Sequence, residues 1–142
     1  MTPSTLVLST RDTAFAGLCE HLLVGAAELE LLVTVSTVEL LEVVRQHDPD
    51  LVLLDVDGHD LFAMRALASK LTIVSEARLV LASAYLSPGS PGLSALLSAV
   101  VASFVEKPRG AAALSLSEQG GADFVAALTN AGLTHARSAR GA

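Results

Sequence analysis

The sequence contains few of the residues on which several large classes of protein depend. Its 142 residues include no tryptophan, 4% aromatic residues and a single cysteine, Cys19. One cysteine cannot form an internal disulfide and no cationic leader precedes the first apolar segment, so we expect a reducing, cytoplasmic setting. No apolar run approaches the roughly 20 residues that cross a bilayer. The formal net charge of -6 repels phosphate backbones and acidic membrane faces, so neither nucleic acid nor a membrane is an expected partner.

Two loops associated with catalysis are also missing. Enzymes that hold phosphate groups after their first strand use a glycine-rich loop there, whereas the stretch STRDTAF, residues 9–15, contains no glycine. The G-x-S-x-G pattern of the esterase nucleophile elbow does not occur either. We therefore predict that the chain is not an enzyme.

What the sequence does contain is a regular alternation of strand-like and helix-like segments. Half of the residues, 51%, are hydrophobic, and short apolar runs alternate with helical stretches of about 10 to 15 residues. Strands are expected at residues 4–10, 29–36, 50–56, 77–84 and 102–108. Helices are expected at residues 12–26, 37–48, 60–71 and 90–100 and around Phe124 to Leu128. This order predicts an α/β fold with a parallel sheet and helices on both faces.

Polar side chains stand where the predicted strands end. They are Ser9 and Thr10 after the first strand, Asp55 after the third, Ser83 after the fourth and Lys107 after the fifth. In an open α/β sheet, ligands and chemistry gather at the carboxyl ends of the strands. One acid, one cation and three hydroxyls are therefore expected to converge.

These strand ends resemble those of the receiver domain of two-component response regulators. The stretches PDLVLLD, LVLASA and FVEKP carry the resemblance, which extends from Leu6 to Pro108. It implies a flavodoxin-like doubly wound five-stranded sheet. It also implies Asp55 as the phosphoryl acceptor, Ser83 as the hydroxyl that follows the phosphoryl group, Lys107 as the cation that contacts it, and Phe104 as an aromatic switch residue.

The C-terminal part is similar to the receiver domain and linker of the chemotaxis protein-glutamate methylesterase, the CheB type. Lys-Pro is followed there by a small-residue loop, a Ser-Leu pair and a helix, as in residues 107–128. We expect a receiver-like domain at residues 1–109, and a linker, a C-terminal helix and a flexible tail at residues 110–142. The esterase domain itself is missing, so the chain could be the regulatory half of such an enzyme or a complete receiver-like protein.

The acid pocket departs from the receiver pattern. In that family a pair of acids at the end of the first strand helps the acceptor aspartate to hold Mg²⁺, but Ser9 and Thr10 stand at these positions. Neutral hydroxyls compensate poorly for the dehydration of Mg²⁺. Asp12 and Asp57 could turn toward the site through water, so we expect metal binding by Asp55, Asp57 and Asp12 to be weak or absent. No cofactor is expected, and Mg²⁺ is needed only if the chain is phosphorylated.

Asp55 therefore has two readings. It is either a buried carboxylate satisfied by a helix cap or by an ion pair with Lys107, or a live phosphoryl acceptor. The first hypothesis makes the chain a pseudo-receiver that binds a signalling protein or a histidine kinase through the fourth helix, fifth strand and fifth helix. A homodimer through the same face is also expected. The second makes it a phosphorylation-dependent receiver with Asp55 as phosphoacceptor.

Overall fold

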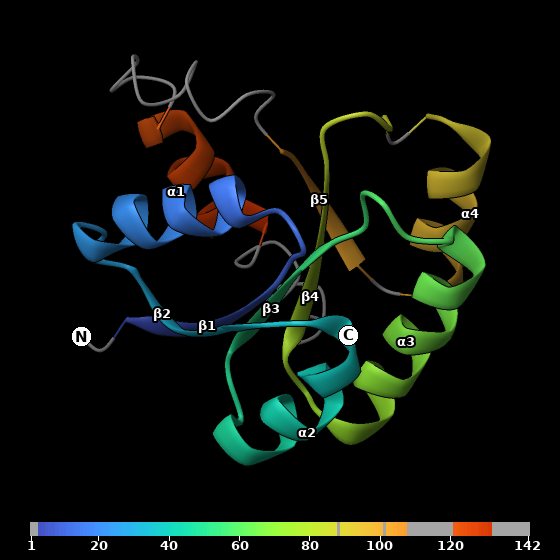
Figure 1. Cartoon of the computed structure of the whole chain (residues 1–142), viewed down its shortest axis with the longest axis horizontal. Helices are drawn as coiled ribbons and strands as arrows, with labels where there is room; N and C mark the ends of the chain where they lie inside the picture. Colours follow the sequence, from blue (N-terminus) through green and yellow to red (C-terminus); the bar gives the residue numbers. More distant parts are fainter. Residues whose placement is uncertain (1–2, 88, 101, 108–120, 132–142) are drawn as a thin grey trace.

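The structure is a computed structural model that describes residues 3–87, 89–100, 102–107 and 121–131 (Figure 1). Its five strands form one parallel sheet in the order β2-β1-β3-β4-β5. They are β1 (Ser4–Ser9), β2 (Leu29–Val35), β3 (Leu51–Asp55), β4 (Arg78–Ser83) and β5 (Ala102–Glu106). The predicted doubly wound parallel sheet is confirmed. Among the described residues, no helix has the length and apolar character that crossing a bilayer requires.

The helices begin where the sequence supplies caps. They are α1 (Thr13–Val24), α2 (Thr37–His47), α3 (Leu61–Val74) and α4 (Pro91–Ala99), and residues 121–131 are also helical. The Asp12 carboxylate accepts hydrogen bonds from the first turn of α1, and the Asp60 carboxylate does so for α3. Side-chain oxygens at this position satisfy N–H groups that the helix leaves free. Since Asp60 caps α3, the helix-cap reading of Asp55 is wrong.

Two hydrophobic clusters hold the helices against opposite faces of the sheet (Figure 1). α2, α3 and α4 pack on one face around residues such as Leu54 and Leu81. α1 and the helix at residues 121–131 cover the other face around Leu53 and Val80. Because both faces are covered, the strands of the centre are apolar throughout, and the polar groups are left to the strand ends.

The helix at residues 121–131 contributes Phe124 and Leu128 to the second cluster. The ring of Phe124 meets that of Phe15 edge to face, with centroids 5.9 Å apart. At the start of this helix, Gly121 lies so close to α1 that a Cβ atom there would be 2.7 Å from Leu22. The predicted linker at residues 110–120 and tail at residues 132–142 lie outside the described residues, and the domain boundary at residue 109 stays a prediction.

Cys19 is fully buried on the inner side of α1. Burial, followed by the negative charge of Asp55, raises the pKa of its thiol to about 12. Because the thiolate is the reactive form, we expect a thiol reagent to modify Cys19 only when the chain unfolds. The time course of modification in native buffer, compared with that in denaturant, measures this; rapid reaction of the native protein would contradict the buried position.

Candidate functional site

The carboxyl ends of the three strands on one side of the sheet bring the candidate site together. Asp55 at the end of β3 pairs with Ala82 of β4, and Ser83 at the end of β4 pairs with Glu106 of β5. One residue further on, the N–H of Lys107 donates to the Ser83 carbonyl at 2.9 Å. The sheet itself therefore sets Asp55, Ser83 and Lys107 side by side.

The Lys107 ammonium lies among three carboxylates. Its Nζ is 2.8 Å from Asp55, 3.1 Å from Asp12 and 3.5 Å from Asp57. Lys107 is 5% exposed, and its ammonium also lies over the ring of Phe15, 5.2 Å from the centroid. A buried ammonium needs such partners, because an unpaired charge away from water is costly.

These contacts shift the pKa values of Lys107 and Asp12. Burial by itself lowers the pKa of Lys107, but the hydrogen bonds to Asp55 and Asp12 and the negative charges of these two residues together outweigh it, so the pKa lies above the ordinary lysine value. The N–H of Phe15, and after it Lys107, lower the pKa of the Asp12 carboxyl, although burial opposes them. Both groups are therefore charged at neutral pH.

Both oxygens of Asp55 accept hydrogen bonds. Oδ2 accepts from the Thr10 hydroxyl at 2.6 Å as well as from Lys107, and Oδ1 accepts from the N–H of Asp57 at 3.0 Å. The residue is 2% exposed. The ion pair with Lys107 thus satisfies this buried carboxylate, together with a hydroxyl and a backbone amide.

Asp57 turns its carboxylate toward the end of β4. Oδ1 accepts from the Ser83 hydroxyl at 2.5 Å and Oδ2 from the N–H of Ala84 at 2.8 Å. Gly58, which follows, has a φ of 78°, a conformation that glycine adopts without strain. From the sequence, Asp57 was expected only as a weak metal ligand, and no pattern in the sequence indicated this contact with Ser83 and Ala84.

The two hydroxyls at the end of β1 differ in their partners. Thr10 bridges the site, because its Oγ1 donates to Asp55 and accepts from the N–H of Asp12 at 3.0 Å. Ser9 is fully buried, and its Oγ has no hydrogen-bond partner among the described residues. Phe104, in contrast, packs half-buried against the cluster on the α4 side, and Pro108 lies outside the described residues.

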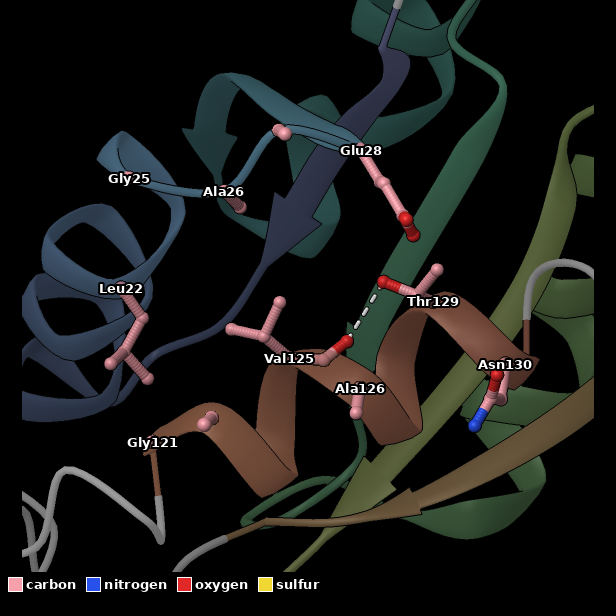
Figure 2. A pocket seen from close by; sticks show the side chains of 11 residues that line it. Leu22, Gly25, Ala26, Glu28, Gly121, Val125, Ala126, Thr129 and Asn130 are labelled. Atoms are coloured by element: carbon pink, nitrogen blue, oxygen red, sulfur yellow. Dashed lines mark hydrogen bonds between the residues drawn. The ribbon is translucent and has the colours of Figure 1, made fainter.

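A separate pocket of about 520 Å³ lies between the end of α1 and the helix at residues 121–131 (Figure 2). Small and apolar side chains line most of it, and Glu28 is its one ionisable lining residue. β2 begins at Leu29, directly after Glu28, so the pocket lies at the end of the sheet where the strands begin. The polar cluster around Lys107 lies at the opposite end, where the strands finish. Because ligands of open α/β sheets bind at the carboxyl ends of the strands, that cluster is the candidate site.

Comparison with known proteins finds a similar fold but no similar sequence. No protein-family model and no curated protein matches this sequence. Solved structures do match, and one of them is the response regulator domain of CheB from Thermotoga maritima. It superposes with a TM-score of 0.73 over 92% of this chain and 96% of that chain, at 12% identity. The chain has the receiver fold.

Two further receiver structures support this assignment. One comes from the crystal structure of the P1 domain of CheA3 in complex with CheY6 from R. sphaeroides. The TM-score is 0.72 at 14% identity, and the match covers 92% of this chain and 98% of that chain. The other is the signal receiver domain of NarL from Mycobacterium tuberculosis, with a TM-score of 0.61, 20% identity, and coverage of 84% and 99%. At these identities the likeness establishes the fold alone.

The Mg²⁺ ion that the receiver fold suggests does not fit the residues at this site. The carboxylates of Asp12, Asp55 and Asp57 face the Lys107 ammonium, and Ser9 and Thr10 add no charge, whereas Mg²⁺ binding calls for carboxylates arranged in a near-octahedral oxygen shell. Within the described ranges, no group of three or more His, Cys, Asp or Glu side chains is arranged to hold a metal ion. The metal-ligand roles of the three aspartates stay predictions.

Proposed function

We propose that this chain is an atypical receiver, a pseudo-receiver, which acts in signal transduction by binding another protein and without Mg²⁺-dependent phosphorylation. The observation that carries the proposal is the set of hydrogen bonds to Asp55. Both of its oxygens are engaged by Thr10, Asp57 and Lys107, and the carboxylate is 2% exposed. An acceptor must instead present an oxygen in line with the incoming phosphorus.

The charges around Asp55 also disfavour phosphoryl transfer. Catalysis of this reaction rests on positioning and on cations that offset the charge of the phosphoryl oxygens. Here one ammonium faces three carboxylates, so the site is already negative before a phosphoryl group arrives. Without a metal, that group would meet repulsion and one shared cation.

The expected partner is a signalling protein or a histidine kinase. The solved structure in which CheY6 is in complex with the P1 domain of CheA3 supports partners of this kind for a receiver fold. Two exposed aromatic side chains follow strands that end at the candidate site, Phe62 at the start of α3 and Tyr85 after β4. We propose these aromatic side chains as a contact for the partner, next to the face of α4, β5 and the helix at residues 121–131 that the sequence predicts for the partner. A homodimer through that face stays a prediction.

The alternative function is a phosphorylation-dependent receiver with Asp55 as the acceptor. One form of this alternative is the regulatory half of a chemotaxis methylesterase. The placement of Lys107 beside Asp55 at 2.8 Å and the likeness to the CheB domain favour it. The two functions differ in what Asp55 does when a phosphoryl mimic is supplied.

We expect Mg²⁺ with beryllofluoride, a mimic of the phosphoryl group, to leave the melting temperature of the protein unchanged. A ligand bound at about a hundred times its dissociation constant adds about 2.7 kcal/mol, which in a chain of this length raises the melting temperature by about 10 °C. Thermal unfolding with and without the mimic measures the difference.

The matched control is Asp55→Asn, which keeps the size of the side chain but cannot accept a phosphoryl group. A rise in melting temperature that the natural chain shows and Asp55→Asn lacks would overturn the pseudo-receiver and establish the alternative. So would the mass increase of one phosphoryl group after incubation with acetyl phosphate and Mg²⁺, if it were absent from Asp55→Asn.

A further inference from the structure

Asp57 connects the turn after β3 with the loop after β4. Its carboxylate is bound by three donors of different kinds: the Ser83 hydroxyl at 2.5 Å, the Ala84 N–H at 2.8 Å and the Lys107 ammonium at 3.5 Å. The side chain is 10% exposed. A hydroxyl, a backbone amide and a cation that converge in a site with little water are the donors that bind oxyanions in proteins.

The hydrogen bonds of Ser83 extend this connection along the chain. Its Oγ donates to Asp57 and accepts from the N–H groups of Tyr85 at 3.2 Å and Leu86 at 2.9 Å. The orientation of the Ser83 hydroxyl thus depends on the Asp57 carboxylate, and the first residues of the loop after β4 depend on Ser83. Asp57 caps no helix, because Asp60 is the cap of α3.

We propose that Asp57 is the resident ligand of an oxyanion site formed by Ser83, Ala84 and Lys107, and that it holds residues 84–86, the start of the loop after β4, in one conformation without any added ligand. The same donors would take a small free oxyanion, a carboxylate or inorganic phosphate, if the Asp57 carboxylate were absent. This inference goes beyond the proposed function, since it concerns the resting arrangement of the site and stands whether or not Asp55 reacts.

The groups that face Asp57 agree with this role. Lys107 supplies the charge, while Asp55 accepts the Asp57 N–H at 3.0 Å and so fixes the backbone from which the carboxylate extends. Arg11 donates to the carbonyl of Gly58 at 3.2 Å and closes the same turn against the loop after β1. The turn after β3 is therefore held in place independently of the carboxylate. The N–H of Lys107 donates to the Ser83 carbonyl at 2.9 Å, so the backbone that carries the donors also stays in position when the carboxylate is removed, while the Ser83 hydroxyl and the residues after it lose their anchor.

The test is the Asp57→Ala variant, melted without Mg²⁺ or a phosphoryl donor while sodium formate or inorganic phosphate is added. The natural chain is expected to melt at the same temperature in either anion as in chloride of equal ionic strength. Asp57→Ala is expected to melt lower in chloride and to recover with a saturable dependence on the anion. At about ten times the dissociation constant the recovery is about 5 °C.

Asp60→Ala is the matched control, because it also removes a carboxylate that accepts a backbone N–H, that of Phe62 at 3.2 Å, but not one that is paired with Lys107. It is expected to lose stability without recovery. Equal recovery in Asp60→Ala, recovery by chloride as well, or no recovery in folded Asp57→Ala would overturn the proposal.

A second variant keeps the inference testable if Asp57→Ala does not fold. Asp57→Asn retains the shape of the side chain but not its charge, so hydrogen exchange at Tyr85 and Leu86 is expected to become faster than in the natural chain, while exchange in α2 stays the same. Unchanged exchange at these two amides would overturn the role of Asp57 in holding the loop. Neither experiment involves phosphorylation of Asp55, so failure here leaves the proposed function standing, and the reverse also holds.

Discussion

Replacement of Lys107 by methionine is expected to lower the free energy of unfolding by about 3–5 kcal/mol, the usual cost of removing one partner from a buried ion pair. The substitution keeps most of the apolar stem but removes the ammonium. Asp55, which is 2% exposed, would then keep only the hydroxyl of Thr10 and the N–H of Asp57 as partners. Its charge would remain buried without a cation.

Urea unfolding at neutral pH measures this loss. The pKa of Lys107 lies above its ordinary value, so the stability that its charge contributes is complete at pH 7 and is lost only as the pH rises through the folded-state pKa. The double variant Lys107→Met/Asp55→Asn is expected to be more stable than the sum of the single effects predicts, because it no longer buries an unpaired charge.

Lys70→Met is the control for loss of a lysine charge as such. Lys70 is exposed on α3, and a surface change of this kind usually stays within about 0.5 kcal/mol. If Lys107→Met lowered the free energy of unfolding as little as Lys70→Met, the ion pair with Lys107 would not be what stabilises the buried Asp55 carboxylate.

The fold could be predicted because sequence and burial agree strand by strand. All five residues of β3 are buried, and the sequence shows them as an apolar run closed by Asp55. The boundaries were less predictable. We expected the third helix to end at Leu71, but α3 continues to Val74, because the β-branched residues Thr72 to Val74 disfavour a helix only weakly and no glycine or proline stops it before Ser75.

The candidate site could be predicted in part. The meeting of Asp55 with Lys107 follows from the strand ends, since the long lysine side chain reaches past β4, which separates β3 from β5. The position of the Asp57 carboxylate did not follow. It depends on the turn at Gly58 and on which neighbour the side chain meets, whereas from the sequence we expected contact with a metal site through water. In the structure Asp57 contacts Ser83, Ala84 and Lys107 directly.

Phe124→Ala is the second substitution for which we expect a large effect, a loss of about 3–5 kcal/mol. Phe124 is 6% exposed and meets Phe15 edge to face at 5.9 Å. The cavity left behind would remove part of the support of Phe15, whose ring also lies below the Lys107 ammonium, 5.2 Å from the centroid. The effect is therefore expected to reach the candidate site, as faster hydrogen exchange in the first turn of α1.

Urea unfolding, which measures the loss of stability in Phe124→Ala, also bears on where the domain ends. Asn130, exposed on the same helix, provides the control Asn130→Ala, which is expected to stay within about 0.5 kcal/mol of the natural chain in urea unfolding. A large loss in Phe124→Ala alone would mean that the folding unit continues through the helix at residues 121–131, so the boundary predicted at residue 109 would fall inside it. If both variants were equally mild, the sheet and its first four helices would not depend on this helix, and residues 1–109 would be the unit to test for partner binding.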